Sequence, residues 1–233
     1  MKFLIVNADD LGYGAGVNRG ISEAIDAGIV TSASLMVNTP GAVEGARIAR
    51  QRPSLSVGLH VNVTNEAQRL VEFDDPDVLR GELERQLARF LELIGRPPTH
   101  LDSHQHVHRR RPCLPVFLEL AREHRLPMRE QPPVVFKGGF YAQWEYGVSD
   151  PSKVSAEALE RILREELTGG VYELAVHPGY FDPAADYVYH QDRELELRTL
   201  CDPRLRPLLR DAGVDLISYH QLAASVAALR DGA

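Results

Sequence analysis

The chain has 233 residues, of which 44% are hydrophobic, and a formal net charge of −7. This length predicts one large domain or two small ones with a sizeable core, and the negative charge argues against nonspecific nucleic-acid binding, which requires a basic surface. Its two cysteines, Cys113 and Cys201, lie far apart and outside any C-x-x-C pattern, so neither a disulfide framework nor a thiolate metal site is expected.

The first residues predict no export signal. MKFLIV passes into the polar NADD too soon to supply the apolar core of a signal peptide. No later segment approaches the roughly 18 apolar residues that a membrane-spanning helix needs. We therefore expect a soluble, cytoplasmic protein with neither a membrane nor a nucleic acid as its partner.

The first half of the chain alternates strands with helices. Apolar runs rich in β-forming residues predict strands over residues 3–10, 32–38 and 55–60. Helical spacing of apolar residues predicts helices over 17–28, over 42–51 after an N-cap at Thr39-Pro40, and from about 77 to Gly95, with a loop over 65–76. The pattern therefore begins as repeated strand–helix units.

The second half continues this alternation, with one exception. Residues 131–153 are rich in proline, glycine and aromatic residues and are predicted to be irregular and functional, with a possible strand at 134–136. Elsewhere we expect strands at 99–104, 126–130, 171–177 and 215–220, a polar loop at 178–192, and helices at 114–124, 155–167, 195–201, 205–213 and 222–231.

Alternating strands and helices predict a parallel sheet with helices outside it. The first strand is not followed by the G-x-G-x-x-G pattern of dinucleotide-binding folds. The expected fold is therefore a TIM-like (β/α) barrel of about seven strands, closed or slightly incomplete.

The segment THLDSHQHVH, residues 99–108, holds four of the nine histidines and one aspartate. In an extended chain alternate residues share a face, so His100, Asp102 and His104 are expected to point the same way. Imidazole is the commonest protein ligand of catalytic divalent metals, and a neighbouring carboxylate can orient it. The segment therefore indicates a metal site.

Ionisable side chains recur at the predicted strand ends, where barrel enzymes build their active sites. These residues are Asp9, Asp10, His60, His104, Arg129, His177 and His220. Two imidazoles and a carboxylate can bind a divalent ion and leave positions open for water. Of the adjacent pair Asp9 and Asp10, one could bind the metal while the other acts as a general base or caps the following turn.

Four motifs in this order, NADDLG, PSLSVGLH, THLDSHQHVH and AVHPGY, make the chain similar to the YdjC family of carbohydrate deacetylases, which includes chitooligosaccharide deacetylases. The resemblance runs from Lys2 to the C-terminal helix. It implies one domain over residues 1–233, a (β/α)-barrel-like fold, removal of N-acetyl groups from amino sugars, and a divalent metal that is usually magnesium.

The resemblance also implies roles for individual residues. Asp10, His60 and His104 match the metal ligands, Asp9 matches the catalytic base, and His177 matches the general acid, which would act in its protonated form. Two histidines and one carboxylate suit zinc better than magnesium, so the identity of the ion stays open. The resemblance leaves the roles of His106 and His108 open.

Four further residues are candidates for substrate contacts. Arg129 could hold Asp9 or a substrate oxygen, and Tyr141, Trp144 and Tyr146 could stack on sugar rings. The stretch after GLHVNVT is shorter than in chitooligosaccharide deacetylases and should shape the substrate cleft.

Three alternatives remain open at this point. One is a metal-dependent phosphoesterase on the same barrel, although such enzymes often carry an early H-x-H where this chain has two aspartates. Another is a sugar-binding protein with a vestigial metal site, which would need neither a base nor an acid. The third keeps the chemistry but takes another N-acylated compound. Assembly as a homodimer is also left open.

Overall fold

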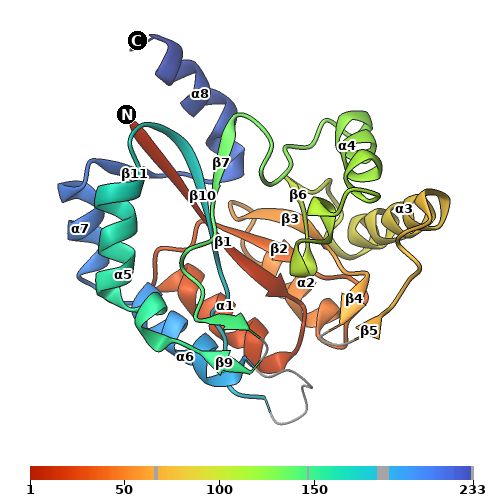
Figure 1. Ribbon diagram of the computed structural model, residues 1–233, viewed down its shortest axis with the longest axis horizontal. Coiled ribbons are helices and arrows are strands. Elements are labelled where there is room, and N and C mark those ends of the chain that lie inside the picture. Colours follow the sequence, from red (N-terminus) through yellow and green to blue (C-terminus); the bar gives the residue numbers. More distant parts are fainter. Residues whose placement is uncertain (66–67, 146, 183–188, 232–233) are drawn as a thin grey trace.

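The computed structural model describes residues 1–65, 68–145, 147–182 and 189–231. Its centre is a curled, seven-stranded parallel sheet in the order β6-β3-β2-β1-β10-β7, with β11 beside the beginning of β1 (Figure 1). The strands are β1 (Lys2–Leu11), β2 (Ser32–Leu35), β3 (Ser56–Val61), β6 (Leu101–Ser103), β7 (Val134–Lys137), β10 (Gly170–Val176) and β11 (Val214–Leu216). Two short antiparallel hairpins lie outside this sheet: β4 (Thr64–Asn65) with β5 (Gln68–Arg69), and β8 (Gln143–Glu145) with β9 (Val148–Ser149).

Helices surround the sheet (Figure 1). They are α1 (Ala15–Asp26), α2 (Ala42–Arg50), α3 (Pro76–Ile94), α4 (Leu114–Glu123), α5 (Ala156–Arg161), α6 (His190–Leu200), α7 (Leu205–Asp211) and α8 (Leu222–Asp231). Shorter turns of helix are η1 (His104–Arg109), η2 (Pro151–Val154), η3 (Ile162–Glu166) and η4 (Tyr219–Gln221). Within the described ranges, no helix is both long and apolar enough to cross a membrane.

Local signals set several of these boundaries. Asp75 accepts hydrogen bonds from the first turn of α3, Gly95 ends α3 with a left-handed φ of 79°, and Ser155 accepts a hydrogen bond from Ala158 N at the start of α5. The predicted cap at Thr39 is wrong. Its hydroxyl donates to Gly12 O at 2.6 Å instead, and α2 begins at Ala42.

The predicted barrel is only partly correct, because the sheet is a half-barrel. The expected strand at 126–130 is reduced to a single bridge between Met128 and Leu101, and no described strand joins this bridge to β7. Arg125 and Glu130 have positive φ values of 55° and 64°. These left-handed residues turn the backbone out of strand conformation on either side of Met128.

The inner face of β1 changes character along its length. Phe3 and Ile5, near the amino end, pack in a small apolar cluster with Ile217 and Tyr219. Asn7 and Asp9 are the next residues on the same face. Leu4, Val6 and Ala8 belong to the main core, which also includes residues of the surrounding helices. The half-barrel is therefore apolar at one end and polar at the carboxyl ends of its strands.

Candidate active site at the carboxyl ends of the strands

A bulge at the end of β1 separates the side chains of Asp9 and Asp10. The pairing of β1 with β2 shifts register between Ala8 and Leu11, and Asp10 has a φ of 68°. A non-glycine residue in this conformation is strained, and bulges commonly redirect side chains beside active sites. Both aspartates are buried but have different partners.

Asp10 lies against two imidazoles. Its Oδ1 is 3.2 Å from His60 Nε2 and 3.0 Å from His104 Nδ1. His60 comes from the end of β3, and His104 begins η1 directly after β6. One ligand atom from each of these three residues lies within 4.8 Å of the other two, so the group could hold a metal ion.

Further charged groups surround these three residues. Arg193 from α6 donates to Asp10 Oδ2 at 2.6 Å, and His60 Nδ1 lies 2.7 Å from Asp102 Oδ1. Burial alone would raise the pKa of Asp10, but Arg193 and His104 hold it well below its usual value. Burial also opposes charge on His60, yet the carboxylates of Asp102 and Asp10 raise its pKa to about 10. The surroundings of His60 therefore favour a positive charge there.

Asp9 is bound by a buried arginine. Arg129 Nη1 and Nη2 donate to the two carboxylate oxygens at 2.7 and 2.6 Å, and Asn7 Nδ2 donates to Oδ1 at 2.8 Å. Arg129 also contacts Asp102 at 2.9 Å and Glu173 at 2.8 Å. Burial would raise the pKa of Asp9, but the charge and hydrogen bonds of Arg129 lower it, so Asp9 is ionised at neutral pH.

His177 follows β10 and faces Asp9. Its Nε2 is 3.8 Å from Asp9 Oδ2, and Glu196 of α6 accepts a hydrogen bond from its backbone N–H. Tyr189 donates to the other oxygen of Glu196 at 2.6 Å. Burial lowers the pKa of His177 to about 4, against the pull of Asp9 and Asp10. The imidazole is therefore neutral at pH 7, contrary to the expectation of a protonated acid.

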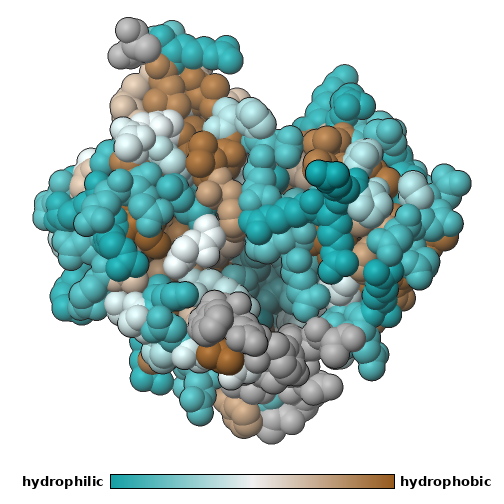
Figure 2. Space-filling model, viewed as in Figure 1, coloured by the Kyte–Doolittle hydropathy of each residue, from teal (hydrophilic) through white to brown (hydrophobic). Residues whose placement is uncertain are grey.

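These groups open into a hollow of about 540 Å³. Figure 2 shows a hydrophilic hollow near the middle of the same view, by the end of β1. Its walls include Tyr141, whose ring centroid is 4.9 Å from that of His177, and His106, whose ring meets Phe136 edge-on at 5.3 Å. The carboxylates, imidazoles and aromatic rings therefore border one solvent-accessible space.

Comparison with known proteins identifies the family. Residues 3–211 match the family model described as YdjC-like protein. This chain belongs to that family. A carbohydrate deacetylase from Geobacillus stearothermophilus is 38% identical to this YdjC-like chain, over 94% of the chain and 98% of the relative. A chitooligosaccharide deacetylase from Serratia marcescens is 34% identical, over 95% and 99%.

Solved structures share the architecture of this YdjC-like protein. A protein from Enterococcus faecalis V583, whose name associates it with cellobiose-phosphate cleavage, aligns with a TM-score of 0.77 at 25% identity, over 95% of this chain and 98% of that one. A family 4 carbohydrate esterase from Streptomyces lividans, in complex with acetate, aligns with a TM-score of 0.57 at 14% identity, over 95% of each chain. The second likeness concerns the fold alone.

The structure brings together most of the predicted site residues of this YdjC-like protein. Asp9, Asp10, His60, His104 and His177 all line the hollow, as does Tyr141. The side chain of Trp144 and the whole of Tyr146 lie outside the described residues.

The prediction that Arg129 binds substrate is not supported. Its side chain is 0% exposed and its guanidinium is occupied by Asp9, Asp102 and Glu173. Of the two expected roles, the structure therefore shows the one in which Arg129 holds Asp9.

The other histidines of the YdjC-like chain have different surroundings. His106 lines the hollow, whereas His100 and His108 are buried and hydrogen-bonded to Ser34 and Ser103, respectively. His220 does not reach the rim. The expected strand at 215–220 ends at Leu216 and pairs only with the beginning of β1, so His220 is exposed on η4.

Several charged residues in the YdjC-like site were not predicted. Arg193 directly follows the polar loop expected at 178–192, and Glu196 lies in the helix expected at 195–201; a buried charge cannot be told from a solvated one in such polar sequence. Glu173 could have been predicted to form a buried ion pair or hydrogen bond, because a carboxylate inside the apolar run VYELAV needs a buried partner. Asp102 was expected on the inner face and contacts His60 there.

Proposed function

We propose that this chain is a metal-dependent hydrolase that removes N-acetyl groups from amino sugars. The observation that carries this proposal is that two adjacent carboxylates have different partners. Asp10 is set against two imidazoles, while Asp9 is held by Arg129 beside His177. The names of the relatives, carbohydrate deacetylase and chitooligosaccharide deacetylase, support the same activity.

Asp10, His60 and His104 fit a divalent ion. Two imidazoles and a carboxylate form an established donor set, and the buried Nε2 of His104 has no hydrogen-bond partner among the described residues. A second group, Asp9 with His60 and Asp102, fits less well because Arg129 already forms ion pairs with both carboxylates. When bound, the ion would supply Lewis acidity toward the acetyl carbonyl and the attacking water.

The surrounding residues supply the proton transfers. Asp9, kept ionised by Arg129, accepts a proton from the water that adds to the acetyl carbon. His177 lies next to Asp9, and its neutral ring can accept that proton and then donate it to the sugar nitrogen as the carbon–nitrogen bond breaks. Glu196 accepts a hydrogen bond from the His177 backbone N–H and so holds the main chain from which the ring projects. The products are acetate and a free amine.

The test is acetate release from N-acetylglucosamine and N,N′-diacetylchitobiose by metal-stripped protein with zinc, magnesium, manganese or cobalt restored in turn. We expect release that depends on the added ion. Absence of acetate with every ion and both sugars would refute the proposal. Phosphate release from sugar phosphates under the same conditions would support the phosphoesterase, and binding without turnover would support the sugar-binding protein.

A further inference from the structure

A series of buried side chains links the C-terminal part of the protein to Asp9. The hydroxyl of Tyr219 on η4 donates to Glu173 Oε2 at 2.8 Å. Glu173 Oε1 accepts from Arg129 Nε at 2.9 Å, and the other two nitrogens of Arg129 donate to Asp9. Tyr219 is 5% exposed, and Glu173 and Arg129 are 0% exposed, so water hardly competes for these contacts. Tyr219 therefore reaches Asp9 through two intervening side chains.

The shape of Arg129 connects the two ends of this series. A guanidinium is planar, and its five N–H donors have a fixed arrangement. The Nε of Arg129 faces Glu173, whereas Nη1 and Nη2 face Asp9. A carboxylate that fixes the position of Nε therefore also fixes the direction in which Nη1 and Nη2 point at Asp9.

The ring of Tyr219 is itself held in place. It stacks on the imidazole of His100, with ring centroids 3.9 Å apart and an angle of 12° between the ring planes. On β3, a Cβ at Gly58 would lie 2.4 Å from His100 Nε2, so only glycine leaves room for this imidazole. The hydroxyl of Tyr219 is therefore presented to Glu173 in one position.

This hydroxyl supplies the donor that Glu173 Oε2 needs. Burial and the neighbouring Glu173 hold the pKa of Tyr219 well above its usual value, so the hydroxyl keeps its proton. A buried acceptor that loses its donor costs about 1–3 kcal/mol, and more if it is charged. Without the hydroxyl, Glu173 would have to turn or take up a proton, and either change would alter its contact with Arg129 Nε.

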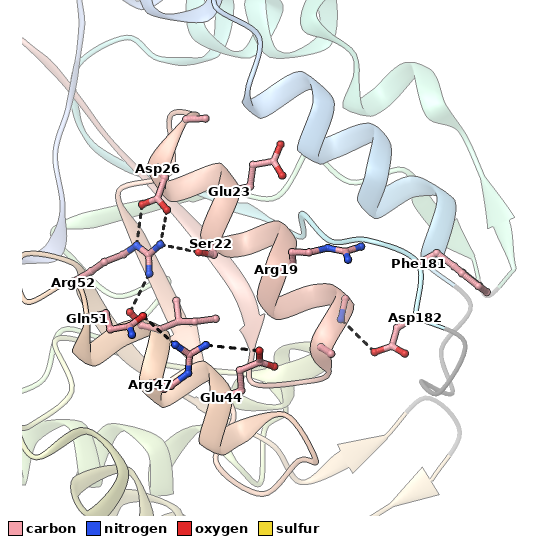
Figure 3. Close-up of a pocket in the computed structure, with 14 residues that line it drawn as sticks. Arg19, Ser22, Glu23, Asp26, Glu44, Arg47, Gln51, Arg52, Phe181 and Asp182 are labelled. Atoms are coloured by element: carbon pink, nitrogen blue, oxygen red, sulfur yellow. Dashed lines mark hydrogen bonds and ion pairs between the residues drawn. The ribbon is translucent and has the colours of Figure 1, made fainter.

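The charges that line a hollow of about 790 Å³ between α1 and α2 are paired within the protein (Figure 3). Arg47 is paired with Glu44, and Arg52 with Asp26. Arg19 lies over an aromatic ring, 4.1 Å from its centroid. These contacts account for the cations without a ligand, so this hollow does not carry the inference.

We propose that Tyr219 is a positioning residue for Asp9 and acts on it through Glu173 and Arg129. The proposal rests on the proposed function, in which Asp9 accepts a proton from the attacking water. Tyr219 is not among the described residues that line the active-site hollow, so its effect on the rate is indirect. It sets the direction of the Asp9 carboxylate and thereby the distance from that carboxylate to the water.

Tyr219→Phe provides the test, because it keeps the ring that stacks on His100 and removes only the hydroxyl. Acetate release by the metal-loaded protein gives kcat and KM, and elemental analysis gives the metal content per chain. We expect kcat to fall by about 10-fold, since a displacement of 1 Å in an active site can cost about 10²-fold. KM and the metal content should stay at wild-type values.

A second measurement does not depend on activity. The Nε–H of Arg129 donates to Glu173 Oε1, so its ¹H–¹⁵N NMR signal reports on that contact. We expect Tyr219→Phe to shift this signal and to speed the exchange of its proton with water. An unchanged signal would overturn the proposal.

Tyr172→Phe is a matched control. Tyr172 precedes Glu173 on β10, is also 5% exposed, and donates its hydroxyl to Gly169 O at 2.9 Å. Both variants lose one buried tyrosine hydroxyl and should show similar falls in melting temperature. Only Tyr219→Phe should change kcat and the Arg129 signal. Equal losses of kcat in the two variants, or loss of the metal from Tyr219→Phe, would contradict the assignment.

The two proposals fail separately. If the wild-type protein releases acetate but Tyr219→Phe keeps the wild-type kcat, the role of Tyr219 is wrongly assigned and the deacetylase remains. If the wild-type protein releases no acetate, the proposed chemistry is wrong. A shift of the Arg129 signal that is confined to Tyr219→Phe would then still support the link from Tyr219 to Arg129, and an unchanged signal would refute that link as well.

Discussion

Replacing Asp9 by asparagine should remove catalysis while the metal stays bound. The carboxylate accepts three hydrogen bonds, two from Arg129 and one from Asn7. An amide oxygen in the Oδ1 position keeps the bond from Arg129 Nη2 and the bond from Asn7. The amide nitrogen then faces Arg129 Nη1, donor against donor, and one charge-assisted bond is lost.

The expected cost to folding follows from that single bond. A hydrogen bond to a charged group contributes about 1.5–3 kcal/mol, and Arg129 stays neutralised by Asp102 and Glu173. For a chain of this length, about 2 kcal/mol corresponds to a fall in melting temperature of roughly 4–8 °C. Loss of a general base should lower the rate by about 10²–10⁴-fold.

The assay compares Asp9→Asn with Asp10→Asn, using metal content per chain by elemental analysis and acetate release at saturating metal. Asp10→Asn replaces an anionic ligand by a neutral one and should lose the ion, whereas Asp9→Asn should retain it. If Asp9→Asn loses the metal and Asp10→Asn keeps it, the two roles are reversed. If both variants keep the metal and most of the activity, this strand end is not the catalytic centre.

Three further predictions concern the histidines. His60→Ala and His104→Ala should each abolish metal binding and acetate release together, and a normal metal content in both would contradict the ligand assignment. His177→Ala should lower the rate by about 10²–10⁴-fold between pH 5 and 8 without changing the shape of the pH–rate profile, because the pKa of His177 lies near 4. If instead only this variant loses the fall in rate at alkaline pH, His177 acts as a protonated acid. Burial also lowers the pKa of His100 to about 4, so the stabilising effect of its neutral form is complete above pH 6.5 and declines toward pH 4. In urea unfolding, the free energy of unfolding should fall between pH 7.5 and pH 5 by about 2 kcal/mol less in His100→Asn than in the wild type. Equal falls in both proteins would show that His100 is not the source of the acid destabilisation.

The sequence by itself determined the family, the alternation of strands and helices, and most of the residues around the active-site hollow. Parallel strands end at one edge of a sheet, so Asp10, His60 and His104 could be placed together from the order of motifs alone. Helix ends such as Gly95 and Ser155 were also predictable, because capping depends on residues adjacent in the chain.

Only the tertiary structure decided how the charges are partnered and how far the sheet closes. Arg193 reaches Asp10 across 183 residues and Arg129 reaches Asp9 across 120, and such contacts depend on packing rather than on local pattern. The positive φ of Asp10 gives it different partners from Asp9 only once β2 pairs with β1. The same holds for His177, because the burial that lowers its pKa exists only in the folded chain.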